Sequence, residues 1–306
     1  MLTTRTTKSE KRETIPKMSK TVFGALILSH GRADNVITFN TLRKHGYTGD
    51  IKVVVDNEDK TVDLYREKFG KDNVIVFDKK AVSDTFDEGD NFQDRRAIIY
   101  ARNASFKIAQ DLGWTHFIQL DDDYTNWSWA FGSDRKYHAN HQIVSLDRVF
   151  MCLVDFLNTT PTLTIALAQG GDFIGGEHSS NLQAINLGRA GKRKAMNTFV
   201  CRVDNPIGFV GRINEDVNTY VRKGMVGELF FATNCARINQ RMTQTNNGGM
   251  TDLYKDSGTY VKSFYTVMYA PSCVVVQPFQ TKYQRFHHRI SWRHAIPKIL
   301  REEVKK

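Results

Sequence analysis

Apolar runs and helix-like periods alternate along the first third of the chain. Runs at 22–28, 51–55 and 73–77 predict buried strands, because continuous apolar runs are typical of strands that are covered on both faces. A helix near Asp34 follows the first run, and a helical stretch over 61–69 precedes the third. This alternation predicts parallel strands with right-handed crossovers, whose carboxyl ends face one shared crevice.

A fourth strand is predicted after a polar, acidic loop over 78–91. The apolar face of a long helix is marked by Ala97, Ile98, Ala101, Ala104, Ile108 and Leu112, and Gly113 ends that helix. The strand over 115–120 then leads directly into three carboxylates, which are Asp121, Asp122 and Asp123. Three acids at the end of a buried strand are the most specific signal in the sequence.

The pattern changes after these carboxylates. Aromatic residues crowd the stretch 124–137 around Gly132, which predicts an aromatic loop. Strand-like runs at 163–168, 199–203 and 229–233 are separated by Gly-rich and Asn-rich loops, which predicts a mixed sheet. No proline-rich or serine-rich linker divides the chain. The expected fold class is therefore α/β, a single domain with a Rossmann-like parallel N-terminal half and a mixed-sheet second half.

The net charge of +10 is located at the two ends of the chain. Residues 1–20 hold six basic and two acidic residues, residues 281–306 hold eight and two, and the stretch between them is balanced. We predict a basic disordered arm, a domain over 21–280 with halves at 21–123 and 124–280, and a basic C-terminal tail. Basic segments displace counterions from a polyanion, so nucleic acid is the expected partner. The alternative is that these ends only keep the chain soluble.

Composition excludes several classes of protein. With 41% hydrophobic and 25% charged residues, the chain is neither collagen-like nor wholly disordered. Its four cysteines form no Cys-x-x-Cys pair, so neither a zinc knuckle nor a disulfide framework is indicated. No apolar window reaches the ~18 residues of a membrane-spanning helix, and the N-terminus lacks a signal peptide. We expect a cytoplasmic protein that does not enter a membrane.

The three carboxylates have the chemistry of a cation site. Side chains of an extended segment alternate, so Asp121 and Asp123 are expected on one side and Asp122 on the other. Two hard oxygen donors can hold Mg²⁺ or Mn²⁺ together with phosphate oxygens and waters, which predicts a diphosphate clamp. Without a cation, the carboxylates raise one another's pKa. The alternative is an exposed acidic turn that caps a following helix.

The order of these features resembles the GT-A glycosyltransferases, which use nucleotide-sugar donors. The resemblance covers residues 22–123 and ends in an Asp-x-Asp motif. Three short motifs are similar to those of the TET/JBP-associated glycosyltransferases of phages and kinetoplastids, which add a sugar to hydroxymethylated pyrimidines in DNA. They are Ser29-His30-Gly31-Arg32, Ala101-Arg102-Asn103 and Leu120-Asp121-Asp122-Asp123-Tyr124.

The resemblance places the donor nucleotide across the ends of the first two strands. It implies that four consecutive residues approach the base and the diphosphate, namely Ser29, His30, Gly31 and Arg32. Asp56 would accept a hydrogen bond from the base, and Asp122 belongs to the donor-binding set. Arg96 or Arg102 would offset the diphosphate charge. The alternatives are that Asp56 is a turn residue and Arg102 a solvated helix position.

A second acidic pair, Glu215-Asp216, follows Asn214 at the start of a short helical stretch. The resemblance implies that such a pair supplies the base of an inverting enzyme, with Asp216 as first choice, Glu215 beside it and Asp172 in reserve. The alternative is that Asn214 caps the helix and that the two acids only suit its macrodipole.

Other features concern the acceptor and the metal. A base extruded from duplex DNA would stack on the aromatic stretch 127–131, unless those rings pack in the core. A basic cluster, Arg189, Lys192, Arg193 and Lys194, and the loop 246–249 would frame a groove. One histidine of the C-terminal segment would complete the metal shell, or all three accompany a DNA-facing surface: His287, His288 and His294.

Together these features predict metal-dependent transfer of a hexose from a UDP-sugar to hydroxymethylated pyrimidines in duplex DNA. Glucose is the first choice of hexose, and the resemblance implies a phage enzyme that acts in the host cytoplasm. The alternatives are a transferase with a glycan or protein acceptor, a DNA-binding protein without chemistry, and a metal-dependent nuclease. The nuclease alternative is weakened because the sequence shows no evident Lys or His beside the three acids.

Overall fold

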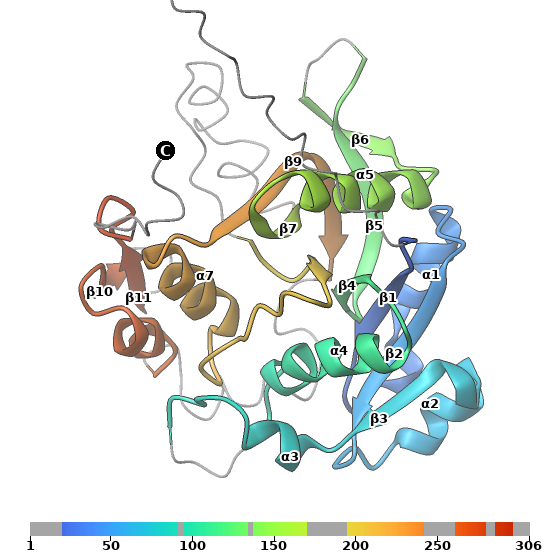
Figure 1. Ribbon diagram of the computed structural model, residues 1–306, viewed down its shortest axis with the longest axis horizontal. Coiled ribbons are helices and arrows are strands. Elements are labelled where there is room, and N and C mark those ends of the chain that lie inside the picture. The colour runs from blue at the N-terminus through green and yellow to red at the C-terminus, as the bar shows by residue number, and fades with distance from the viewer. Residues whose placement is uncertain are drawn as a thin grey trace, which may run out of the picture.

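A nine-stranded sheet forms the centre of the computed structural model, in the order β3-β2-β1-β4-β8-β7-β9-β5-β6 (Figure 1). The structure describes residues 20–90, 95–133, 137–169, 195–241, 261–279 and 285–295. The strands are β1 (Phe23–Leu28), β2 (Asp50–Asp56), β3 (Val74–Phe77), β4 (His116–Asp121), β5 (Tyr124–Phe131), β6 (Tyr137–Gln142), β7 (Thr162–Gln169), β8 (Phe199–Arg202) and β9 (Leu229–Gln240).

The two halves of the sheet differ in strand direction, as predicted. Strand β1 pairs in parallel with β2 and β4, and β2 pairs in parallel with β3. Beyond β4 the sheet is mixed, because β8 is antiparallel to β4 and β7, β7 is parallel to β9, and β5 is antiparallel to β9 and β6. The register Leu28↔Asp121 brings the loop after β1 beside the acidic residues that follow β4. The expected α/β fold class is confirmed.

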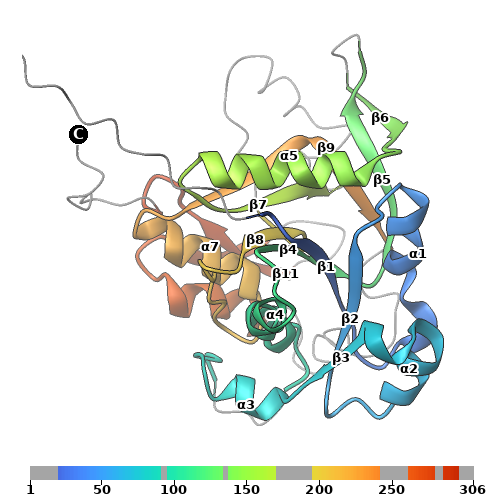
Figure 2. The ribbon, with the colours of Figure 1, turned by 45° about the vertical axis from the view of Figure 1, so that its right-hand side comes forward.

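Helices cover both faces of the sheet (Figure 2). On one face lie α1 (Ile37–Lys44), α2 (Val62–Phe69) and α5 (Leu146–Thr159), and on the other lies α4 (Ile99–Asp111). Strand β1 contributes side chains to both faces. Ala25 and Ile27 pack on the face covered by α1, α2 and α5, and Leu26 and Leu28 pack on the face covered by α4. The remaining short elements of this half are η1 (Ala33–Asn35), η2 (Lys71–Asn73) and α3 (Lys79–Ser83).

A smaller cluster packs beside the second half of the sheet. It contains α7 (Glu215–Met225), a helical segment over 261–269, and the antiparallel pair β10 (Val274–Phe279) and β11 (Arg285–Ile290). Tyr220 of α7 stacks on Trp292 with ring centroids 5.9 Å apart. Residues 285–295 therefore belong to this cluster, and β11 pairs with β10 across the boundary predicted at residue 280. The residues beyond 295 lie outside the described part of the chain.

Two local expectations are wrong. The aromatic stretch after residue 123 is the strand β5 rather than a loop, and Trp127 is fully buried in the core between Tyr124 and Phe150. The ring of Trp127 thus has the packing role, whereas Trp129 on the same strand is 39% exposed. The acidic loop after β3 contains the short helix α3, whose Asp78 accepts a hydrogen bond from the Ala81 amide.

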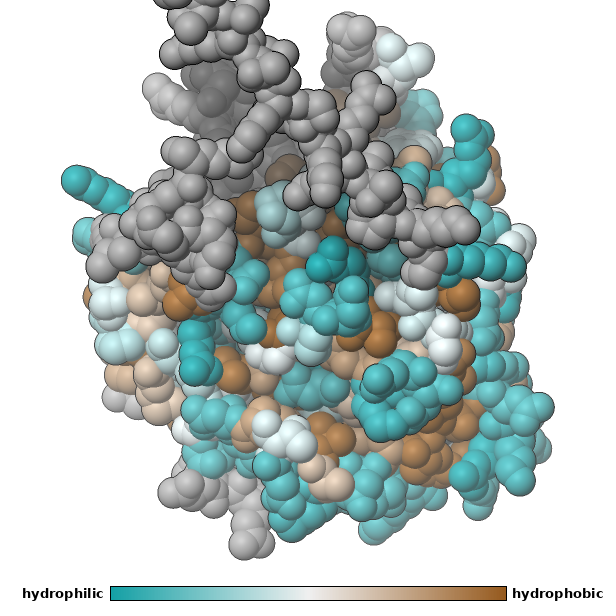
Figure 3. Space-filling view, viewed as in Figure 1, coloured by the Kyte–Doolittle hydropathy of each residue, from teal (hydrophilic) through white to brown (hydrophobic). Residues whose placement is uncertain are grey.

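The surface of the described residues is mixed. On the face shown in Figure 3, hydrophilic side chains are interspersed with hydrophobic ones. In the described part of the chain, every helix is too short or too polar to cross a membrane.

Candidate functional site

We call Asp121, Asp122 and Asp123 the acidic turn. The loop after β1 is fixed by side chains that come from the segment 56–65 and from this acidic turn. We call Ser29, His30, Gly31 and Arg32 the β1 loop. Gly31 adopts a φ of 66°, a backbone conformation that favours glycine. Its amide donates to Asp59 Oδ2 at 2.7 Å, and the Arg32 amide donates to the Tyr65 hydroxyl at 2.8 Å. The predicted turn is thus held rigidly at the carboxyl edge of the sheet.

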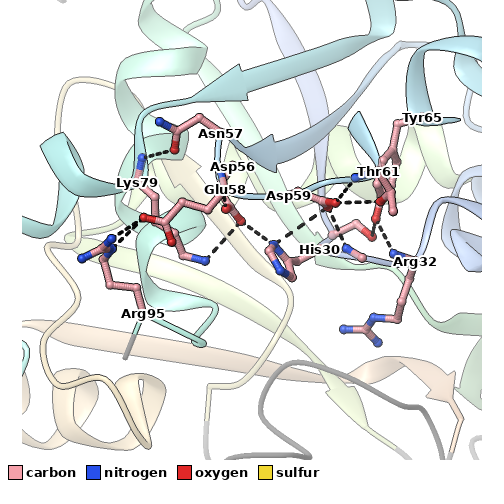
Figure 4. A network of polar contacts seen from close by, with 12 residues as sticks. His30, Arg32, Asp56, Asn57, Glu58, Asp59, Thr61, Tyr65, Lys79 and Arg95 are labelled. Carbon is pink, nitrogen blue, oxygen red and sulfur yellow. Dashed lines mark hydrogen bonds and ion pairs between the residues drawn. The ribbon is translucent and has the colours of Figure 1, made fainter. Parts of the chain in front are cut away.

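The ring of His30 points toward two buried carboxylates, those of Asp56 and Asp59 (Figure 4). Its Nδ1 is 2.7 Å from Asp56 Oδ2 and 3.9 Å from Asp59 Oδ2. The other partners of Asp56 are the Lys79 ammonium at 3.3 Å and the Glu58 amide at 3.1 Å. Burial raises the pKa of Asp56, but the hydrogen bond from His30 and the charge of Lys79 outweigh it and hold the pKa below its usual value.

This arrangement concerns the prediction that Asp56 accepts a hydrogen bond from the base of the nucleotide. Asp56 is only 4% exposed and its oxygens already have three partners, whereas the His30 side chain is 40% exposed. His30 is therefore the member of this pair that can meet a ligand. Asp56 fixes the orientation of the imidazole through its contact with Nδ1.

The three aspartates of the acidic turn have different surroundings. Asp122 is buried, accepts a hydrogen bond from Ser29 Oγ at 2.6 Å, and lies 3.4 Å from Arg32 Nη1. Asp121, the last residue of β4, has a side chain that is 22% exposed, and Asp123 is half-buried. Asp122 thus ties the turn to the β1 loop, and Asp121 and Asp123 are the acids that solvent reaches.

Burial and mutual repulsion leave these two acids poorly compensated. Burial raises the pKa of Asp121 to about 7, with Asp123, Asp122 and Glu215 adding to the effect of burial and Arg102 opposing it. Burial, followed by the charge of Asp122, raises the pKa of Asp123 to about 6. A divalent cation would relieve this repulsion, and carboxylate oxygens are the ligands that Mg²⁺ and Mn²⁺ prefer. The donor set fits such an ion.

The described residues alone supply few ligands for a cation. Among the described residues, no group of three or more His, Cys, Asp or Glu side chains is arranged to hold a metal ion. The predicted completion of the shell by a histidine therefore finds no support in His287, His288 or His294. His288 is buried in β11 with its ring 4.4 Å from that of His287, and His294 Nδ1 lies 3.1 Å from Ser291 Oγ.

Arg102 joins the acidic turn to the second acidic pair. Its guanidinium lies 3.0 Å from Glu215 Oε1 and 3.5 Å from Asp121 Oδ1, and it also contacts the rings of Phe199 and Phe209. Arg102 is 1% exposed, so it is neither a solvated helix position nor open to a diphosphate in this structure. Burial raises the pKa of Glu215 against the opposing charge of Arg102.

The start of α7 differs from a capped helix. Asn214 has a left-handed φ of 58°, and its side chain does not cap the helix but donates to the Lys262 carbonyl at 2.7 Å. Asp216 is half-buried and accepts a hydrogen bond from the Val217 amide at 2.8 Å. The capping role considered for Asn214 is therefore wrong. The catalytic role of Asp216 stays a prediction.

The remaining predicted residues divide between exposed and undescribed positions. Arg96 is exposed and precedes α4, and its contact with a diphosphate stays a prediction. The reserve base Asp172, the basic cluster at 189–194 and the loop 246–249 lie outside the described residues.

The structure also shows a basic residue that sequence reasoning missed. The Arg241 amide donates to the Asp123 carbonyl at 3.3 Å, and Arg241 Nη1 donates to Asn35 Oδ1 at 3.0 Å. The charge of Arg241 lowers the pKa of Asp123, against the larger effect of burial. Its place beside the acids follows from the length of β9, which runs well beyond the predicted end at residue 233.

Comparison with known proteins assigns the family. The model of the TET-associated glycosyltransferase family matches residues 23–249, about three quarters of the chain. No curated protein matches the chain.

Several solved structures resemble the fold. One is glucosyl-3-phosphoglycerate synthase from Mycobacterium tuberculosis with Mn²⁺, UDP and phosphoglyceric acid, at 9% identity and a TM-score of 0.44 over 89% of this chain and 87% of that one. The same synthase with Mg²⁺ and UDP gives 8% identity and 0.44 over 89% and 88%. A mycobacterial protein gives 11% and 0.45 over 89% and 84%. Because these TM-scores are below 0.5, the family assignment rests on the family model.

Proposed function

The chain belongs to the TET-associated glycosyltransferase family, and we propose that it transfers a hexose from a UDP-sugar to hydroxymethylated pyrimidines in DNA. One observation carries the proposal. Inside the matched region, the β1 loop and the acidic turn are joined directly, through Ser29 Oγ to Asp122 at 2.6 Å and Arg32 to Asp122 at 3.4 Å. A loop that meets a nucleotide is thereby fixed against a turn that presents two further acids.

The acids of this turn are suited to a divalent cation. Asp121 and Asp123 would hold Mg²⁺ or Mn²⁺, with the remaining ligands coming from the donor and from water. When bound, the cation supplies charge neutralisation of the departing diphosphate. Asp122 is committed to Ser29 and Arg32, so it acts as an anchor of the turn.

The donor nucleotide would lie along the β1 loop. His30 presents its exposed edge to the base, while Asp56, itself paired with Lys79, holds the ring through Nδ1. Arg32 and Arg241 flank the acidic turn and would balance the diphosphate charge. Arg96 remains a further candidate for this role, whereas Arg102 is too deeply buried to take it.

Asp216 is our choice for the general base. A carboxylate there would take the proton from the acceptor hydroxyl as its oxygen attacks the anomeric carbon. The bond between that carbon and the diphosphate oxygen breaks, and the nucleoside diphosphate leaves with the electron pair. A single displacement of this kind inverts the anomeric configuration. Arg102 joins the start of α7 to the end of β4, because it contacts both Glu215 and Asp121.

The proposal of DNA as the acceptor is supported by charge. The chain carries +10 overall, and its excess of basic residues lies at 1–20 and 281–306. Such a distribution favours a polyanion and gives salt-dependent binding with little sequence preference. The DNA-modifying enzymes to which the sequence motifs are similar have the same kind of acceptor.

Mass spectrometry of defined oligonucleotides tests the proposal. Duplexes that contain hydroxymethylcytosine, hydroxymethyluracil or only ordinary bases are incubated with the protein, Mn²⁺ and a panel of nucleotide sugars. We expect one hexose of added mass on a hydroxymethylated duplex alone, and none with the Asp121→Asn, Asp123→Asn double variant. Transfer to a glycan or protein with every duplex unchanged would contradict the DNA acceptor.

A further inference from the structure

Thr38, the second residue of α1, makes two hydrogen bonds to the acidic turn and a third to Tyr124, the residue that follows the turn. Its amide donates to the Asp122 carbonyl at 3.1 Å, and its hydroxyl donates to the Asp121 carbonyl at 2.6 Å. The same hydroxyl oxygen accepts from the Tyr124 amide at 2.9 Å. Thr38 is fully buried, and these partners lie more than 80 residues away in sequence.

The path of the chain explains why the turn needs these bonds. The acidic turn connects β4 to β5, but the two strands are not neighbours in the sheet, because β8, β7 and β9 lie between them. The turn is therefore not a hairpin, and the two strands cannot hold it by pairing with each other. Its main-chain groups bond instead to Thr38 and, at Asp123, to the Arg241 amide.

We propose that Thr38 is a positioning residue that sets the spacing of the Asp121 and Asp123 carboxylates for a divalent cation. The inference rests on the function proposed above. Thr38 meets no ligand itself. It fixes the main chain on both sides of Asp122, so the directions of the two flanking side chains are determined by a residue of α1. The same helix follows the β1 loop in the chain, with only η1 between them.

Two neighbouring threonines separate this role from simple packing. Thr41 is also buried in α1, but its hydroxyl donates to the Ile37 carbonyl of its own helix at 3.1 Å. Thr38→Val keeps the shape of the side chain and removes the hydroxyl bonds to the Asp121 carbonyl and the Tyr124 amide. Thr41→Val removes a buried hydroxyl without touching the turn, and Thr38→Ser keeps the hydroxyl.

Titration of the full chain with Mn²⁺ alone, followed by electron paramagnetic resonance of the free ion, tests the inference without any turnover. We expect Thr38→Val to bind Mn²⁺ about tenfold more weakly than wild type, since loss of buried hydrogen bonds of this kind is worth about one factor of ten. Thr38→Ser is expected to recover most of the affinity, and Thr41→Val to bind as wild type does. Hydrogen exchange of the Tyr124 amide is expected to accelerate in Thr38→Val only.

The outcomes distinguish this inference from the proposed function. Wild-type affinity for Mn²⁺ in a folded Thr38→Val variant would overturn the role of Thr38 and leave the metal site in place. An equal loss of affinity in Thr41→Val would reduce the effect to general packing and overturn it too. Absence of Mn²⁺ binding by the wild-type chain would instead overturn the metal assignment on which the role of Thr38 depends.

Discussion

Replacing Asp121 by asparagine is expected to stabilise the metal-free protein at neutral pH. Burial, with the charges of Asp123, Asp122 and Glu215, raises the pKa of this carboxyl to about 7 against the opposing charge of Arg102. An acid whose pKa is higher in the folded state favours folding at low pH, and that contribution is lost as the pH rises through about 7. Asparagine keeps the shape of the side chain and cannot ionise.

The size of the effect follows from the pKa. A rise in pKa from 3.8 to about 7 corresponds to ~4 kcal/mol before solvent screening is considered. The side chain is 22% exposed, and solvent screens part of the repulsion, so we expect ~2 kcal/mol. Without metal, Asp121→Asn is therefore expected to exceed the wild type in free energy of unfolding at pH 8 and to match it at a pH of about 4.

Urea denaturation in a chelating buffer at these two pH values provides the assay. The matched control is Asp111→Asn, which changes an exposed aspartate at the end of α4 that pairs with Lys107. It is expected to change the free energy of unfolding by less than ~0.5 kcal/mol at either pH. Mn²⁺ with UDP should stabilise the wild type at pH 8 and leave Asp121→Asn unchanged, since only a ligand that binds the folded state stabilises it.

The result that refutes this reasoning is specific. If Asp121→Asn is less stable than the wild type in chelator at pH 8, the carboxylate is compensated in the fold and does not await a cation. A gain of the same size at both pH values would show that the asparagine packs better and that ionisation plays no part.

Three further predictions concern the second acidic pair and the C-terminus. Asp216→Asn is expected to lower kcat by about 10²–10⁴ with the Kd for UDP unchanged; near-normal turnover in a steady-state assay would exclude Asp216 as the base. Arg102→Gln is expected to lower the free energy of unfolding by about 3 kcal/mol, because it leaves Glu215 buried without its cation; a loss below ~1 kcal/mol in urea denaturation would contradict the role of this pair. Removal of residues 296–306 is expected to flatten the dependence of DNA affinity on salt in a filter-binding assay, and an unchanged slope would place the DNA contacts elsewhere.

The parallel half of the fold could be predicted because its strands are continuous apolar runs between polar turns. The run predicted at 51–55 is β2 over Asp50–Asp56, and the one at 115–120 is β4 over His116–Asp121. Strands that are buried on both faces carry this signal in every residue. The connections between these strands are short, and short connections allow few topologies.

In the second half, the runs predicted at 163–168, 199–203 and 229–233 fall in β7, β8 and β9, but other elements lacked such a signal for physical reasons. Strand β5 has irregular registers with both neighbours, so its buried residues do not alternate, and its aromatic content was interpreted as a loop. The strand β11 carries Arg285 and Arg289 among its residues, so charge concealed its pairing with β10. The amphipathic helix α5 was not predicted, although its apolar residues recur at helical spacing.

In the candidate site, the sequence predicted where the acidic residues lie but not which residues contact them. The three aspartates follow a strand in sequence, so their place at the edge of the sheet could be inferred. The contact of Arg102 with Glu215 joins residues 113 positions apart, and that of Thr38 with the acidic turn joins residues 83 or more apart. No local pattern encodes such contacts, because they arise from the packing of α1, α4 and α7 around the end of β4.

Calorimetric titration with UDP tests most directly the central claim that the acidic turn holds a nucleotide diphosphate through a divalent cation. The full chain is titrated in the presence of Mn²⁺ and again in chelator, beside the Asp121→Asn, Asp123→Asn double variant. The account predicts binding by the wild type with Mn²⁺, and loss of most of that affinity in chelator and in the double variant. Equal affinity for UDP under all three conditions would contradict it.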